Sequence, residues 1–203
     1  MWHSIYQKLR YREWSWARVV SDLFSPPVIW GVFAFPIAFR FADSTAQALL
    51  WAWTYTILVC VIPVSYIGWM VYRGRITDMH MPLRRERIVP LLVSIVATTI
   101  AWWTLRFMGA PPVMPLLALV SLAQLIVIVL ITLVWQISVH AMITSSTTIA
   151  TAALFGMGYA LLTVPIVMLV SAARLNLKRH TPAQIIVGAA VGALVPVLVL
   201  VII

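Results

Sequence analysis

Long apolar segments separated by short polar ones dominate the pattern along the chain. Residues 46–72 and 112–135 carry no charged side chain, and residues 88–107 carry only Arg106. A bilayer core about 30 Å thick needs about 20 apolar residues per helix, so each segment predicts a transmembrane helix. A shorter apolar segment, 27–42, follows the helix-breaking Ser25-Pro26-Pro27 and is short enough to be re-entrant. The last apolar segment is 182–203.

The apolar stretch from Ala141 to Ala173 is too long for one span. As a single helix it would reach roughly 50 Å, far beyond the hydrocarbon thickness. Gly156 and Gly158 lie near its middle and suit a tight turn. We therefore predict a hairpin of two short helices, 141–155 and 159–173.

The N-terminal segment has a different pattern, in which apolar residues such as Leu9, Trp16 and Leu23 recur at nearly helical spacing among Lys and Arg. This pattern predicts an interfacial amphipathic helix over residues 1–24. Residues 25–203 are predicted to form a single transmembrane domain. The expected fold is all-α, a polytopic bundle of six to seven transmembrane helices preceded by the interfacial helix.

The composition supports a membrane protein. Hydrophobic residues make up 63% of the 203 residues and charged residues 9%, which excludes a soluble fold. Cys60 is the only cysteine, so disulfides and cysteine-ligated metal sites are excluded as well. Trp and Tyr gather near the ends of the predicted spans, as expected for an aromatic belt.

The net charge of +9 is explained by where the basic residues lie along the chain. With the hairpin, the N-terminal segment and connections 73–87, 136–140 and 174–181 emerge on one membrane face, which then holds 12 of the 14 Lys and Arg. The positive-inside rule predicts that this face is cytoplasmic, in a bacterial-type inner membrane. Membrane lipids are the expected partners of these charges, and nucleic acid is not.

Polar residues gather in three places on that face. They are Asp78 with Arg84, Arg85 and Arg87, then Ser138 with His140, and then Arg174 with His180. Ionisable groups at the ends of membrane helices are costly and indicate a functional site. Guanidinium groups bind phosphate oxygens, and two imidazoles can act as nucleophile and acid. The set suits phosphoryl transfer with no metal and no cofactor.

These residues also resemble a known family. Arg174-Leu-Asn-Leu-Lys-Arg-His180-Thr-Pro-Ala-Gln184 is similar to the third motif of type 2 phosphatidic acid phosphatases, which is Arg, five residues, His, three residues and usually Asp. Ser138-Val139-His140 resembles the second motif, Ser-Gly-His. The segment from Asp78 to Pro90 resembles an arginine-rich first motif.

The resemblance implies a role for each of these residues. His180 would be the nucleophile that forms a phosphohistidine, and His140 would be the general acid. Gln184 stands where the family usually has the Asp that orients the nucleophile, and Asp78 is a second candidate for orienting. The implied phosphate binders are Arg84, Arg87, Ser138 and Arg174.

The resemblance favours an integral-membrane hydrolase acting on a lipid phosphate or a polyprenyl diphosphate. The alternative is a catalytically degenerate homologue that serves as a structural or pigment-associated subunit of a larger membrane complex. Three departures from the family pattern allow this alternative: His80 in place of Lys, Val139 in place of Gly, and Gln184 in place of Asp. His140 could instead hydrogen-bond a neighbouring helix, or ligate a pigment or haem, and the role of Gln184 could be limited to capping the last helix. A prenyltransferase would need paired aspartates, and Asp22, Asp43 and Asp78 are isolated.

Overall fold

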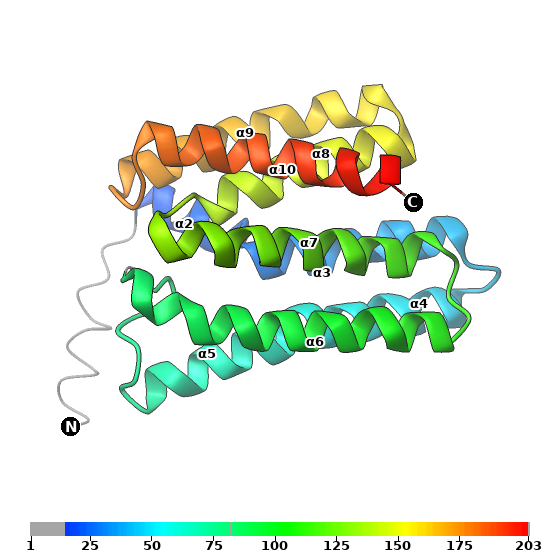
Figure 1. Ribbon diagram of the computed structural model, residues 1–203. Helices are drawn as coiled ribbons and strands as arrows, with labels where there is room; N and C mark the ends of the chain where they lie inside the picture. The colour runs from blue at the N-terminus through cyan, green and yellow to red at the C-terminus, as the bar shows by residue number, and fades with distance from the viewer. Residues whose placement is uncertain (1–14, 82, 203) are drawn as a thin grey trace.

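The computed structural model describes residues 15–81 and 83–202, and every regular element within those ranges is a helix (Figure 1). In chain order these are α2 (Trp16–Leu23), α3 (Pro26–Phe41), α4 (Thr45–Tyr55), the π-helix η1 (Thr56–Val61), α5 (Ile62–Tyr72), the 3₁₀-helix η2 (Arg84–Arg87), α6 (Ile88–Phe107), α7 (Val113–Val134), α8 (Val139–Phe155), α9 (Met157–Asn176) and α10 (Pro182–Ile202).

Five helical stretches in the described part of the chain are long and apolar enough to cross a membrane. They are Thr45–Tyr72, Arg84–Phe107, Val113–Val134, Met157–Asn176 and Pro182–Ile202. A sixth is obtained if α2 and α3, which are bent by 48° at the break between them, form one span, and α8 is a shorter apolar helix. The predicted fold, a polytopic α-helical membrane bundle, is confirmed.

The N-terminal prediction is only partly covered by the structure. Residues 1–14 of the predicted interfacial helix lie outside the described residues, and α2 accounts for the rest up to Leu23. The side chain of Ser15 caps α2 by accepting a hydrogen bond from the backbone N–H of Arg18. Ala17 and Ser21 are buried on one face of α2, whereas Trp16 and Leu23 are more than half exposed.

The predicted hairpin is confirmed. Gly156 has a φ of 101°, which L side chains rarely adopt, and the chain reverses there between α8 and α9. Because of this reversal, the α5–α6, α7–α8 and α9–α10 connections lie at the same end of the bundle (Figure 1). We call this end, which carries the three polar groups, the basic end.

A π-helical turn interrupts the longest span. The backbone N–H of Ile62 bonds to the carbonyl of Ile57, five residues earlier. Pro63 follows directly, and proline has no N–H and clashes with the carbonyl four residues before it. The wider turn accommodates this proline without breaking the helix, and it places Val59 and Cys60 on the inner side, where both are buried.

Helices α8 and α10 approach each other closely through two glycines of α10. A Cβ on Gly188 would lie 2.6 Å from the carbonyl oxygen of Ser138, and a Cβ on Gly192 would overlap the carbonyl of Met142. The backbone N–H of Ser138 also donates to the carbonyl of Gln184 at 3.0 Å. The small-residue pair therefore fixes the start of α8 against the start of α10.

We predict that Gly192→Ala destabilises the bundle by about 1–3 kcal/mol, because a methyl group there forces the two backbones apart. Thermal unfolding in detergent measures the loss. Gly158→Ala is the matched control, since a Cβ at Gly158 meets nothing within 4 Å. Equal stability of the Gly192 variant and the control would contradict the close contact.

Candidate functional site

A cavity of about 430 Å³ opens in the bundle between α3, the α4–α5 span, α6, α7 and the start of α8. Its polar side chains come from the basic end, and apolar residues line the remainder, including Val59, Val64, Leu91 and Leu125. The polar wall consists of Asp22, His80, Arg87, His140, Arg174 and His180. An amphiphilic molecule with an anionic group at one end matches this distribution.

Arg174 is the most deeply buried charged residue of this wall, with 3% of its surface exposed. It lies in the last turn of α9, and its Nη1 donates to the hydroxyl of Ser21 at 2.7 Å. Its Nε is buried without a hydrogen-bond partner among the described residues. A buried guanidinium that lines a cavity favours an anionic ligand, because burying a cation costs free energy unless a negative charge compensates it.

His180 follows α9 and lies beside the first turn of α10. Its Nδ1 is 3.1 Å from Oε1 of Gln184, which also accepts the backbone N–H of Thr181 at 3.1 Å. Because a backbone N–H can only donate, the Gln184 atom must be an oxygen that accepts, and Nδ1 must therefore carry the proton. In the neutral ring, Nε2 is left with a free lone pair, as a nucleophile requires.

The same glutamine caps α10. The backbone N–H of Gln184 donates to the hydroxyl of Thr181 at 3.3 Å, which completes the reciprocal capping box with Pro182 at the first helical position. The side chain of Gln184 thus both caps α10 and contacts His180, so the two interpretations of this residue are compatible.

The charge state of His180 follows from its surroundings. Its pKa is lowered from 6.5 to about 4, chiefly by burial and next by the neighbouring Arg174, against a smaller upward effect of the hydrogen bond to Gln184. Arg87 and Arg179 also lower the pKa. The imidazole is therefore neutral at pH 7, the state in which its Nε2 can attack an electrophile.

His140 is held by α2. Its Nε2 lies 3.1 Å from the carbonyl oxygen of Ser21 and 3.4 Å from the hydroxyl of the same residue. A carbonyl oxygen only accepts, so this nitrogen is the protonated one in the neutral ring. Ser21 thereby joins His140 to Arg174, and 8% of His140 is exposed.

A fourth part of the site is formed by His80 and two aspartates. The sequence had indicated Asp78 as an orienting residue, but not that Asp22 and His80 would lie beside it. His80 Nε2 lies 3.2 Å from Asp22 Oδ1, and His80 Nδ1 lies 3.6 Å from Asp78 Oδ1. Asp78 also pairs with Arg179 at 3.4 Å. A side-chain hydrogen bond with His80 holds the pKa of Asp78 well below its usual range, and Arg179 adds to this effect. Asp78 thus orients His80, whereas Gln184 orients His180.

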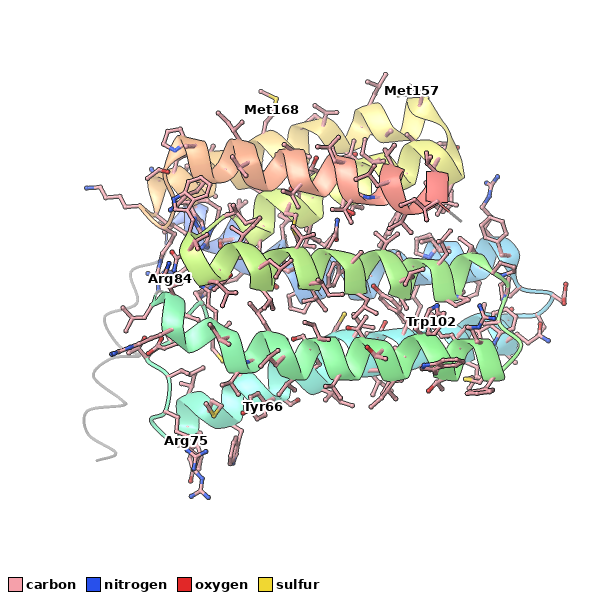
Figure 2. All side chains as sticks on the ribbon, in the orientation of Figure 1. Tyr66, Arg75, Arg84, Trp102, Met157 and Met168 are labelled. Carbon is pink, nitrogen blue, oxygen red and sulfur yellow. The ribbon has the colours of Figure 1, made fainter. Side chains whose placement is uncertain are left out.

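The other predicted site residues differ in whether they line the cavity. Arg87 lines the cavity, and its Nε donates to the carbonyl of Met81 at 2.9 Å. Arg84 is exposed and away from the cavity wall, although it lies at the same end of the bundle (Figure 2). Ser138 is fully buried and caps α8 by accepting the N–H of Ala141 at 3.4 Å. Neither Arg84 nor Ser138 lines the cavity, whereas the two histidines and Arg174 do.

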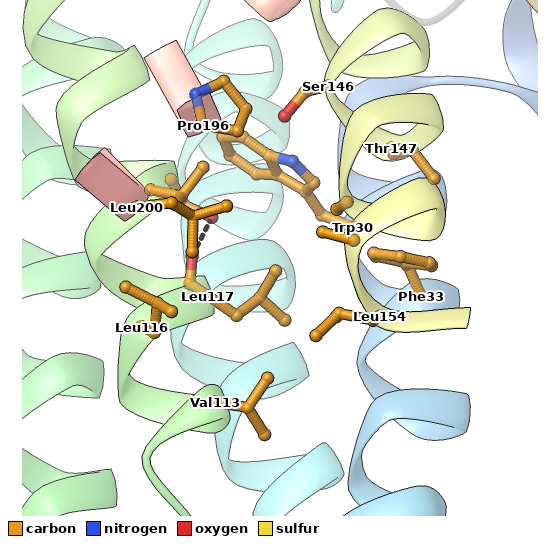
Figure 3. A pocket seen from close by; sticks show the side chains of 14 residues that line it. Trp30, Phe33, Val113, Leu116, Leu117, Ser146, Thr147, Leu154, Pro196 and Leu200 are labelled. Carbon is orange, nitrogen blue, oxygen red and sulfur yellow. Dashed lines mark hydrogen bonds between the residues drawn. The ribbon is translucent and has the colours of Figure 1, made fainter. Parts of the chain in front are cut away.

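A second, smaller pocket of about 60 Å³ lies deeper in the bundle (Figure 3). Its lining is mostly apolar and includes Phe33, Leu117, Leu154 and Leu200. Trp30 lines both this pocket and the larger cavity.

No protein-family model, curated protein or solved structure matches the chain. Among the described residues, no group of three or more His, Cys, Asp or Glu side chains is placed to hold a metal ion.

We predict that inorganic phosphate or vanadate raises the melting temperature of the protein, because an anion in the cavity would compensate the charges of Arg174 and Arg87, which line it. A ligand that binds only the folded state stabilises it by RT ln(1 + [L]/Kd). Arg87→Gln should weaken anion binding about tenfold or more, since hydrogen bonds to charged groups contribute about 1.5–3 kcal/mol.

Arg85→Gln is the matched control, because Arg85 is exposed in the same 3₁₀-helix and does not line the cavity. A thermal-shift titration that shows equal binding in both variants would contradict an anion site at Arg87.

Proposed function

We propose that the protein is an integral-membrane phosphatase that hydrolyses a lipid phosphate or a polyprenyl diphosphate through a phosphohistidine. The observation that carries this proposal is the cavity itself. It combines an unprotonated imidazole nitrogen, Nε2 of His180, with the guanidinium groups of Arg87 and Arg174 at one end, and it continues between apolar helices at the other. The resemblance of its motifs to type 2 phosphatidic acid phosphatases agrees with this assignment, and we propose that the chain is a divergent member.

The proposed reaction has two steps. Nε2 of His180 attacks phosphorus, and the bond from phosphorus to the leaving oxygen breaks as the phosphorus–nitrogen bond forms. Water then attacks the phosphohistidine and releases phosphate, which restores the free imidazole. Arg174 and Arg87 would stabilise the negative charge on the equatorial oxygens, and these residues supply the nucleophile and the charge stabilisation without a metal ion.

The shape of the cavity supports an amphiphilic substrate. The headgroup would lie against Arg174 and His180, and the hydrocarbon chain would lie against residues such as Val64, Leu91 and Leu125. If the basic end faces the cytoplasm, as the positive-inside rule predicts, isoprenoid diphosphates made in the cytoplasm are the favoured substrates.

A second candidate function is a degenerate homologue that acts as a structural subunit of a membrane complex. Two observations favour it. Ser138 is occupied in the cap of α8, and Nε2 of His140 is bound to a backbone carbonyl, so both side chains have structural partners.

Phosphate release from a panel of lipid phosphates and polyprenyl diphosphates, with chelator present, decides between the two functions. We predict turnover by the wild type and a loss of at least about 1,000-fold in His180→Ala, because the variant lacks the nucleophile. No turnover on any substrate would favour the structural subunit. Turnover that is unaffected by the substitution would rule out His180 as the nucleophile.

We also predict that the acid limb of the kcat/KM profile lies near pH 4, because His180 must be neutral to attack and its pKa is lowered to about 4. Gln184→Glu should move this limb upward by about one unit or more, since a carboxylate beside Nδ1 favours the imidazolium.

Glutamate also completes a capping box, so the Gln184→Glu variant keeps the helix start while it changes the charge. Gln184→Ala, which removes the cap without adding a charge, is the comparison. An acid limb that moves equally in both variants, or one near pH 6.5 in the wild type, would contradict this account of His180.

A further inference from the structure

The proposed reaction needs a group that gives a proton to the leaving oxygen, and the family resemblance assigns that role to His140. The geometry around His140 fits it poorly. Its Nε2 proton is bound to the carbonyl of Ser21, and the ring shares Ser21 with the Arg174 guanidinium. To donate from Nδ1 the ring would need a second proton, and a further positive charge next to a buried guanidinium is unfavourable.

His80 is surrounded by negative charge, whereas His140 lies beside a positive one. Each of its ring nitrogens faces a carboxylate oxygen, Asp22 at 3.2 Å and Asp78 at 3.6 Å. A neutral imidazole has one N–H, so only the doubly protonated ring can present a proton to both carboxylates. The ring lines the cavity and lies nearly parallel to His140, with 6.4 Å between the ring centroids.

The two aspartates differ in position. Asp78 also accepts the backbone N–H of His80 at 3.4 Å, pairs with Arg179, and does not line the cavity. Asp22 does line the cavity and is partly exposed. The Nδ1 side of the ring is therefore held from behind. The Nε2 side is paired with Asp22, which itself lines the cavity, so a substrate oxygen would receive the Nε2 proton by replacing the Asp22 carboxylate as its acceptor. His80 differs from His140 because carboxylates face both nitrogens of the His80 ring, whereas His140 lies beside a guanidinium.

We propose that His80, positioned by Asp78, is the catalytic acid and base of this site, and that His140 positions Ser21 and Arg174. This inference rests on the proposed phosphatase function. In the first step, His180 Nε2 bonds to phosphorus, the bond from phosphorus to the lipid oxygen breaks, and that oxygen takes the proton from Nε2 of His80. In the second step, water attacks phosphorus, gives its proton to the now neutral His80, and the phosphorus–nitrogen bond breaks.

The test compares two substrates that differ in their need for an acid. Dodecyl phosphate releases a strongly basic alkoxide, whereas 4-nitrophenyl phosphate releases a stable phenolate that needs no proton. The quantity compared is kcat/KM, which reports the first step and not the later attack of water. His80→Gln should lower kcat/KM about 100-fold or more for the first substrate and less than about tenfold for the second, because general acid catalysis contributes about 10²–10⁴. His140→Gln should slow both substrates by the same factor.

Asp78→Asn is the second variant. It keeps the His80 ring but removes the charge behind Nδ1. Its loss of activity should therefore also be larger on dodecyl phosphate than on 4-nitrophenyl phosphate, but by a smaller factor than in His80→Gln. Elution volume and melting temperature of each variant show that it is folded. A loss that is equal on both substrates in His80→Gln, no loss on either, or a dependence on the leaving group in His140→Gln alone would overturn the proposal.

The outcomes separate this inference from the function on which it rests. If the wild type hydrolyses neither substrate nor any lipid phosphate, the phosphatase itself fails, and the role of His80 fails with it. If the wild type is active and His180→Ala is not, but His80→Gln shows no dependence on the leaving group, only the assignment of the acid is overturned.

Discussion

The burial of one guanidinium group organises the basic end of this protein. A charged side chain inside a membrane bundle is costly unless it has partners, and Arg174 is only 3% exposed. Its Nη1 is satisfied by Ser21 of α2, and its Nε has no hydrogen-bond partner among the described residues. The requirement to satisfy this cation thus connects the N-terminal part of the described chain to the hairpin.

Much of this arrangement follows from patterns that a sequence shows directly. Apolar segments of sufficient length predicted the spans, and the excessive length of the stretch from 141 to 173 predicted the turn at Gly156. That turn alone brings His140 and His180 to the same end of the bundle. Thr181 and Gln184 were recognisable as a capping box, which the structure has. These features depend on local sequence and on the thickness of a bilayer.

The remainder depends on packing between segments that are far apart in the sequence. Nothing in the sequence near Ser21 and Asp22 indicates that they contact His140, Arg174 and His80, because those contacts depend on how α2 lies against α9. Arg84 is exposed and Arg87 lines the cavity, and nothing in the sequence distinguishes these two arginines of one 3₁₀-helix. Ser138 was a candidate ligand from its position beside His140, whereas its hydroxyl caps a helix.

Trp30 has a consequence for selectivity. Trp30 lines both the large cavity and the smaller apolar pocket, whereas the polar wall belongs to the large cavity alone. If the cavity binds a lipid as we propose, headgroup recognition and tail length would be governed by different residues on different helices. A change at position 30 could alter how long a hydrocarbon chain fits while the polar wall stays as it is, which would allow the two preferences to evolve separately.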